Sequence, residues 1–347
     1  MNRTRDTILS LLLLGALGAF LWWADGHLDK YQIQVLNVVA INIILAVSLN
    51  LIYGFTGLFS LGHAGFMLVG AYVCAILILP ASQKAATFIL QPMMWPFSVM
   101  NAPFIVAVLA GGVVAAVFGF LIAFPVLRLG GDYLGIASLG FAEILRVVAN
   151  NIVPITNGAL GLKGIPKEAN LWWNYGWCAV TLVVIARLIN SNAGNVLKAI
   201  RDDEVAAKAM GIDVFRWKLI SFTLGAFFAG VGGALLGSLL TTISPKMFTF
   251  LLTFNVLMIV VAGGLGSITG TVISGVFITI LMEWLRFVEA PMHIGTMTIP
   301  GIPGMRMVVF SLALLCIILF RREGIMGMRE WSWSGLFGLF GKRGEAR

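Results

Sequence analysis

Long apolar runs, separated by charged residues, prolines and glycine clusters, dominate the pattern of the chain. Ten of these runs have about the length that a helix needs to cross the apolar core of a bilayer. They lie at residues 8–24, 33–53, 64–81, 103–127, 133–150, 171–190, 219–241, 250–267, 270–288 and 305–320. Because a helix satisfies its own backbone hydrogen bonds in lipid, the pattern predicts an all-α fold, a polytopic membrane helix bundle of about ten transmembrane helices.

The composition of the 347 residues supports this prediction. Hydrophobic residues make up 59% of the chain and charged residues only 11%, whereas a soluble domain carries about 25% charged residues. These values exclude a disordered chain and a soluble domain, and we expect no nucleic-acid partner despite the net charge of +8. Cys74, Cys178 and Cys316 all lie within apolar runs, which argues against a disulfide framework or a thiolate metal site.

The distribution of basic residues predicts the orientation in the bilayer. With ten spans and the N-terminus in the cytoplasm, 15 of the 23 Lys and Arg residues fall on the cytoplasmic side, as the positive-inside rule requires. We therefore expect both termini to be cytoplasmic. The first run follows Arg3 and Arg5 without an A-x-A cleavage site, and it is interpreted as a retained signal anchor.

One internal segment, residues 191–218, is long and densely charged. The acidic residues at 202–204 precede a run of helix-forming residues that ends at Gly211. Acidic side chains favour a helix start and glycine favours a helix end, so the pattern predicts a short cytoplasmic helix. A short helix with alanine side chains can seat closely in a groove of another protein, although a solvated connector would fit the same pattern.

Three parts of the chain carry a family resemblance. Residues 199–211, AIRDDEVAAKAMG, resemble the cytoplasmic "EAA" loop of ABC importer permeases, in the version found in branched-chain amino acid permeases of the LivM type. Residues 50–72 contain the family's G-x-x-G-x-x-S-L-G-H signature, and residues 320–327, FRREGIMG, resemble its usual ending. The resemblance runs from about residue 33 to residue 327 and includes the GGLGSITG segment at 263–270.

This resemblance implies a function for the chain and a role for the loop. It implies a permease subunit of an ATP-driven importer that takes up branched-chain or related hydrophobic amino acids across the bacterial inner membrane. In that family the loop supplies the coupling helix that docks into the ATPase. Ala206, Ala207 and Gly211 match the small residues and the glycine of that loop. The candidate coupling residues here are Ile200, Arg201, Asp202, Asp203, Glu204, Ala206, Ala207 and Gly211. Glu204 stands one residue earlier than in the general pattern, because the position six before Gly211 is Val205.

The same resemblance implies the partners and the domain organisation. Residues 1–327 would form the transmembrane permease domain, with the coupling loop at 191–218, and residues 328–347 a cytoplasmic or interfacial tail. The expected partners are a second, LivH-like permease, ABC ATPase subunits, a periplasmic substrate-binding protein and the lipid bilayer. The chain has no G-x-x-x-x-G-K-[ST] motif, so ATP and Mg are expected on the ATPase subunit and no cofactor on this chain.

Glycines and polar residues interrupt the apolar pattern before the third run and suggest part of a translocation path. Irregular backbone at membrane depth is tolerated only inside protein or beside a watery cavity. A broken element beside the path is one interpretation; close helix packing, with His63 capping a helix, is the other. A tight cytoplasmic turn is expected at the glycines of residues 263–270. The path candidates here are Asn50, Gly57, Ser60, Gly62 and His63.

Two acid–base pairs within the predicted spans are the remaining path candidates. Glu143 with Arg146 and Glu283 with Arg286 are each spaced i, i+3, so each pair can meet on one face of a helix. They would either contact the charged head of a zwitterionic amino acid or form structural ion pairs near helix ends.

The chain shows no sign of covalent chemistry. Its three histidines are isolated, and no zinc, thiol-redox or Ser–His–Asp motif is present, so we expect no enzyme activity on this chain. Two alternative functions remain open. One is a urea or short-amide permease of the same architecture, and the other is an ion-coupled secondary transporter that uses Glu143 and Glu283.

Overall fold

The computed structural model describes residues 3–88, 91–128, 133–286, 292–294 and 297–299, together with residues 304, 305, 308, 309, 311, 312, 324–327 and 330. For residues 3–14, 292–294 and 297–299 it describes the backbone alone. The predicted span at 305–320 lies mostly outside the described residues, and the predicted tail at 328–347 lies outside them except for residue 330.

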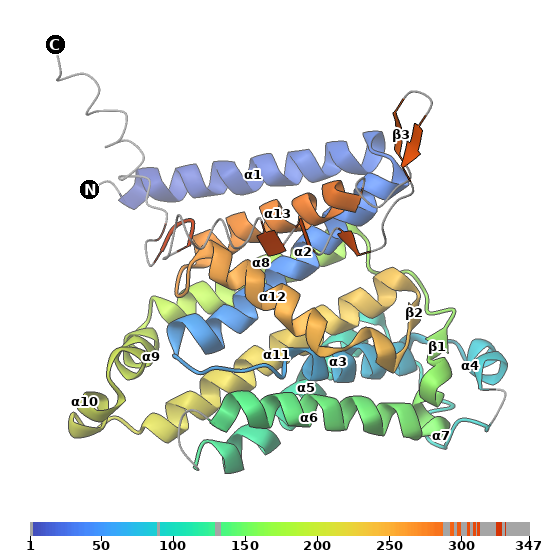
Figure 1. Ribbon diagram of the computed structural model, residues 1–347, viewed down its shortest axis with the longest axis horizontal. Helices are drawn as coiled ribbons and strands as arrows, with labels where there is room; N and C mark the ends of the chain where they lie inside the picture. Colours follow the sequence, from blue (N-terminus) through green and yellow to red (C-terminus); the bar gives the residue numbers. More distant parts are fainter. Residues whose placement is uncertain are drawn as a thin grey trace.

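Helices make up most of the described chain (Figure 1). The longer helices are α1 (Arg3–His27), α2 (Lys30–Asn50), α3 (His63–Ile78), α5 (Phe104–Val126), α6 (Tyr133–Asn151), α8 (Leu171–Ile189), α9 (Asn192–Asp202), α11 (Val214–Leu240), α12 (Phe250–Gly263) and α13 (Ile268–Trp284). Short elements lie between them: the π-helix η1 (Leu51–Phe55), α4 (Ala81–Thr87), α7 (Val153–Thr156), η2 (Gly158–Leu160), α10 (Glu204–Ala209) and η3 (Pro245–Met247). Four very short strands pair as β1 (Leu162–Lys163) with β2 (Thr242–Ile243) and as β3 (Met292–Ile294) with β4 (Met297–Ile299).

The predicted all-α membrane bundle is confirmed, but the count of ten spans is not. Nine of the ten predicted apolar runs coincide with helices. Within the described residues, six helical segments are long and apolar enough to cross a membrane, and a seventh is added if α3 and α4 form one span bent by 120°. Helix α13 is apolar but shorter than these segments, with 17 residues, and α3 ends before Pro80, where the bend toward α4 begins.

The core of the bundle forms around α2 and α11. Their apolar windows are 78% and 67% buried, whereas those of α6 and α8 are 28% buried. Helix α11 packs against α2, α3 and α5, and α2 also packs against α8 and α13. Helices α3 and α11 approach at Gly70 and Gly230, where a Cβ on Gly70 would lie 2.0 Å from the Gly230 carbonyl oxygen. Small residues allow this close approach, which is typical of helix packing in membranes.

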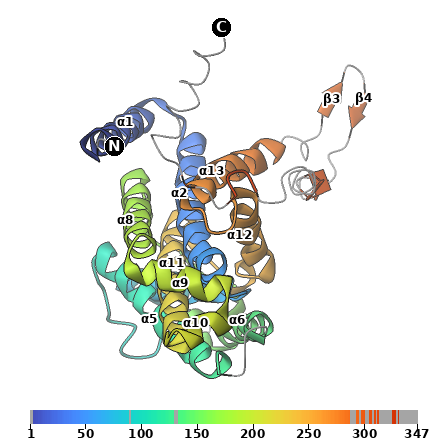
Figure 2. The same ribbon diagram turned by 90° about the vertical axis from the view of Figure 1, so that its left-hand side faces the viewer.

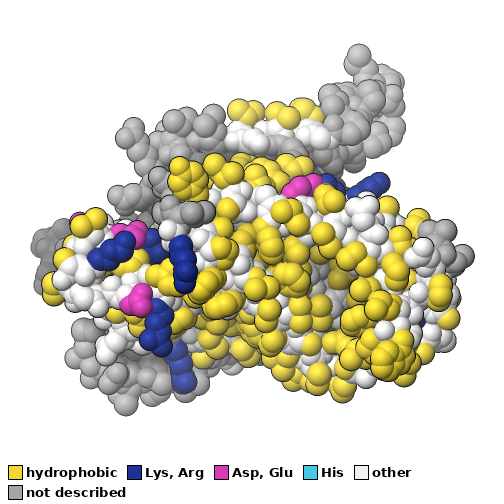
Figure 3. All heavy atoms as spheres, turned by 90° about the horizontal axis from the view of Figure 1, so that it is seen from below, with side chains coloured by type: hydrophobic (Ala, Val, Ile, Leu, Met, Phe, Trp, Pro, Cys, Tyr) yellow, Lys and Arg dark blue, Asp and Glu magenta, His cyan; other side chains and the backbone are white. Residues whose placement is uncertain are grey.

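Polar segments gather at the two ends of the bundle. Helices α9 and α10 lie at the end where α1 begins, whereas α4, α7 and the β1–β2 pair lie at the opposite end (Figure 1). Viewed from the first end, α9 and α10 cover the start of α11 (Figure 2). Hydrophobic side chains cover most of the face seen in Figure 3, and its basic and acidic side chains gather mainly at the α9–α10 end. This is the distribution expected for a protein embedded in a bilayer.

Candidate functional site

The densely charged segment forms two helices joined by one extended residue. Asp203 lies between α9 and α10 with φ −156° and ψ 108°, and its side chain accepts hydrogen bonds from the backbone N–H groups of Val205 at 2.8 Å and Ala206 at 3.0 Å. The predicted acidic helix start is therefore confirmed. Helix α9 was not predicted from the sequence, although Leu197 and Ile200 are buried at i, i+3 spacing and could have revealed one face of a helix.

Gly211 ends α10, as predicted. The N–H of Ile212 donates to the Ala207 carbonyl at 3.1 Å, and the N–H of Gly211 donates to the Lys208 carbonyl at 3.0 Å. This pair of bonds is a Schellman motif, which requires a left-handed residue after the helix. Gly211 supplies it with φ +83°, and no other group lies within 4 Å of a Cβ placed there.

The side chains of α10 divide into a buried set and an exposed set. Ala207 is buried in a small apolar cluster with Ile200 and Val214. Ala206 is exposed, as are Val205 at 78% and Met210, the residue that follows α10, at 83% of their full exposure. The structure therefore places Ala206 on the open surface and Ala207 inside the loop, and it adds two large apolar side chains to that surface.

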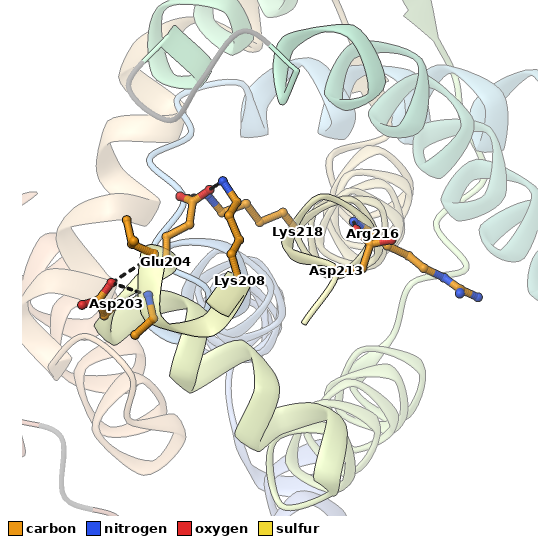
Figure 4. Close-up of polar contacts among 8 residues, drawn as sticks. Asp203, Glu204, Lys208, Asp213, Arg216 and Lys218 are labelled. Carbon is orange, nitrogen blue, oxygen red and sulfur yellow. Dashed lines mark hydrogen bonds and ion pairs between the residues drawn. The ribbon is translucent and has the colours of Figure 1, made fainter. Parts of the chain in front are cut away.

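Glu204 fixes α10 to the start of α11. Its carboxylate forms ion pairs with the ammonium groups of Lys218 at 2.6 Å and Lys208 at 2.9 Å (Figure 4). Hydrogen bonds from Lys218 and then Lys208 hold the pKa of Glu204 below its ordinary value. The glutamate that stands one residue early in the motif thus serves to position α10.

The predicted interruption before the third run is present and lies inside the protein. Helix α2 continues into the π-helix η1, residues 56–62 are not helical, and α3 begins at His63. Thr56 and Ser60 within this connection are each only 1% exposed. The Thr56 hydroxyl lies 2.6 Å from that of Ser221 on α11. Neighbouring helices therefore cover part of the broken backbone, in keeping with what the bilayer tolerates, whereas Gly57 and Phe59 in the same connection are exposed.

Asn50, at the end of α2, connects this interruption to the turn between α12 and α13. The predicted tight turn at residues 263–270 is confirmed. The amide nitrogen of Asn50 donates to the Ser267 carbonyl at 2.9 Å and to the Thr271 hydroxyl at 2.8 Å. Its amide oxygen accepts from the Gly266 N–H at 3.0 Å. Asn50 is 1% exposed, so a single buried side chain holds the two glycine-containing segments together.

His63 and Gly62 lie against two further helices. A ring nitrogen of His63, Nε2, lies 3.0 Å from the Ser48 hydroxyl, whereas α3 has no side-chain cap. The interpretation of His63 as a helix cap is therefore wrong, because its ring points back to α2. A Cβ on Gly62 would lie 2.8 Å from the Ser138 carbonyl oxygen on α6. The interrupted segment therefore packs closely against α6, as the second interpretation expects.

Both predicted acid–base pairs form, but away from the glycine segments. Arg146 donates through Nε to Glu143 at 2.9 Å, and the Glu143 carboxylate is about half exposed on α6. Arg286 donates to Glu283 at 3.1 Å at the far end of α13, where the Tyr31 hydroxyl also contacts Glu283. The structure therefore brings Asn50, Gly57, Ser60, Gly62 and His63 into one region and leaves the two ion pairs outside it.

Sequence comparisons assign the family. The model of the branched-chain amino acid transport system / permease component family matches residues 31–319. The chain belongs to this family. Over 313 residues it is 30% identical to the LivM permease protein of the high-affinity branched-chain amino acid transport system of Salmonella typhimurium, covering 80% of this chain and 68% of that protein.

More distant relatives include both permease types. The chain is 23% identical to a probable LivM permease of Methanocaldococcus jannaschii, over 82% of this chain and 89% of that protein. It is 24% identical to the LivH permease of Escherichia coli K12, over 68% of this chain and 79% of that protein. No solved structure matches the chain. With its membrane-spanning helices, the chain is a multi-pass membrane permease.

Proposed function

We propose that this chain is a permease subunit of an ATP-driven importer of branched-chain amino acids. The observation that carries the proposal is the exposed surface of α10 within a member of this permease family. Val205, Ala206 and Met210 present apolar side chains to solvent from a helix that is fixed on both sides by its own chain. A contiguous exposed apolar surface is the kind that a partner protein covers, and we name these three residues the docking surface.

The proposed partner at the docking surface is an ABC ATPase. The chain has no phosphate-binding loop of the Walker type, so hydrolysis, with ATP and Mg, belongs to that partner. A second permease of the LivH type completes the pore, because the chain's relatives include separate LivM and LivH proteins. A periplasmic binding protein delivers the amino acid to the face opposite the docking surface.

The orientation follows from the same arrangement. The start of α1 lies at the α9–α10 end of the bundle (Figure 1), which supports an orientation with the N-terminus and the docking surface on one side of the membrane. We assign that side to the cytoplasm of a bacterial cell, because ATP is there and most basic residues gather there. The membrane is then the inner membrane.

Gentle detergent extraction of the tagged chain from its native membrane, followed by mass spectrometry, tests the proposal. The expected companions are a P-loop ATPase and a second permease, and the Val205→Asp variant should lose the ATPase while it keeps the permease. Lys163→Asp, an exposed change on β1 at the other end of the bundle, serves as the matched control. Recovery of the chain alone from repeated mild preparations would contradict the proposal.

The ligand of the companion binding protein tests the substrate. Calorimetry with leucine, isoleucine and valine should show binding, and urea should show none. The opposite result would leave the importer in place and replace its substrate with a short amide.

A further inference from the structure

Arg201 at the end of α9 reaches away from the docking surface and into the bundle. Its Nη1 donates to the Gly54 carbonyl in η1 at 3.1 Å. Its Nε and Nη2 donate to one carboxylate oxygen of Asp202, at 2.9 Å and 2.7 Å. The Arg201 side chain is 21% exposed, whereas that of Asp202 is 65% exposed. The carboxylate at the surface therefore orients the guanidinium toward the interior.

Two glycines leave room for Arg201. A Cβ on Gly57 would lie 3.1 Å from Cγ and 3.3 Å from Cα of Arg201, and a Cβ on Gly266 would lie 2.8 Å from its Nη1. Gly57 has φ +74° and Gly266 has φ +80°, so both positions also favour glycine on conformational grounds. Arg201 thus touches both glycine-containing segments, which come from opposite halves of the chain.

The two glycine-containing segments that Arg201 contacts are also bonded to each other. Asn50 binds the backbone of Gly266 and Ser267, and a Cβ on Gly54 would lie 2.3 Å from the Gly266 nitrogen. Through these contacts Arg201 is connected to the ends of α2 and α12 and to the start of α13. The Glu204–Lys218 ion pair and the packing of Ala207 on Val214 connect the α9–α10 unit to α11 instead, and α9 also packs against α8.

We propose that Arg201 is the positioning residue that carries movement of the α9–α10 unit to the two glycine-containing segments, and that it does not bind the ATPase. The inference rests on the proposed function, because it assigns a route for coupling within that importer. The planar guanidinium suits this task since it binds Asp202 and the Gly54 carbonyl at once, and lysine offers no such fork.

The test uses the complete complex, purified with its companions and reconstituted in proteoliposomes, with leucine uptake and ATP hydrolysis measured on the same sample. In Arg201→Ala we expect the ATPase to copurify normally and to hydrolyse ATP. Uptake per ATP should fall by at least about fivefold, the lower end of the range typical of coupling between two sites. Arg201→Lys should recover part of the loss, and Gly57→Ala, which crowds Arg201, should reproduce it.

Arg216→Ala is the matched control. Arg216 lies in the first turn of α11, and its guanidinium points away from the Glu204–Lys218 pair (Figure 4), so uptake per ATP should stay at the wild-type value. Loss of the ATPase from Arg201→Ala, or wild-type uptake per ATP in that variant, would overturn the inference. A wild-type complex without ATP-dependent uptake would instead refute the proposed function.

Discussion

Replacement of Asn50 by alanine should lower the free energy of unfolding by several times the amount that one ordinary hydrogen bond between membrane helices contributes. The change removes three hydrogen bonds, to Ser267, Thr271 and Gly266, from a residue that is 1% exposed. Hydrogen bonds between membrane helices contribute about 0.6 kcal/mol each, so three contribute about 2 kcal/mol. The Ser267 carbonyl keeps a bond from the Thr271 hydroxyl at 2.7 Å.

The Gly266 N–H loses the acceptor that Asn50 provides, and a buried donor without an acceptor costs about 1–3 kcal/mol. This cost replaces the contribution of about 0.6 kcal/mol from the third hydrogen bond, so the expected loss in the free energy of unfolding is about 2–4 kcal/mol. Asn42→Ala is the matched control, because the Asn42 amide makes one bond, to the Thr279 hydroxyl at 2.9 Å on the same pair of helices, and should cost about 0.6 kcal/mol. Reversible unfolding of the purified chain in mixed micelles measures both values, and a loss below about 1 kcal/mol for Asn50→Ala would refute this reasoning.

Three further outcomes concern the α9–α10 unit. Val205→Asp or Met210→Asp should weaken ATPase binding at least about tenfold, equivalent to about 1.4 kcal/mol, in a copurification titration; unchanged binding would move the docking surface elsewhere. Gly211→Ala should destabilise the unit by about 1 kcal/mol because its φ is positive, and equal thermal stability would contradict the Schellman motif. Because Lys218 lowers the pKa of Glu204 from 4.5, the stability from this pair is present above pH 4.5 and is lost as the pH falls through the lowered pKa. Glu204→Gln should therefore have a lower melting temperature than the wild type at pH 7, and the two melting temperatures should converge once the pH is below the lowered pKa of Glu204. A difference that persists in that acidic range would argue against the ion pair.

The bundle could be predicted from the sequence because each apolar run reports its own helix. The length of an apolar run can be measured without knowing which helices pack against it. The predicted positions of α2, α5 and α11 were therefore correct within a few residues. The number of ten membrane spans was not confirmed within the described residues, since hydrophobic length alone does not distinguish a helix that crosses the membrane from one that bends, as α3 and α4 do.

The side chains of the candidate site depend on contacts between distant segments. The motif places Ala206 and Ala207 side by side, and only the packing of Ile200 and Val214 shows that Ala207 faces inward. In the same way, the bond from Arg201 to Gly54 spans 147 positions in the sequence. Local patterns predict caps and helix ends well, whereas they carry no signal for a contact of this kind.

ATP-dependent uptake of labelled leucine tests the central claim most directly. The complex that copurifies with this chain is reconstituted in proteoliposomes together with its binding protein, and ATP is supplied on the side of the docking surface. We predict that uptake requires ATP and the binding protein and is unaffected when a protonophore removes the proton gradient. Uptake that proceeds without ATP and stops with the protonophore would contradict the account and make this chain an ion-coupled transporter.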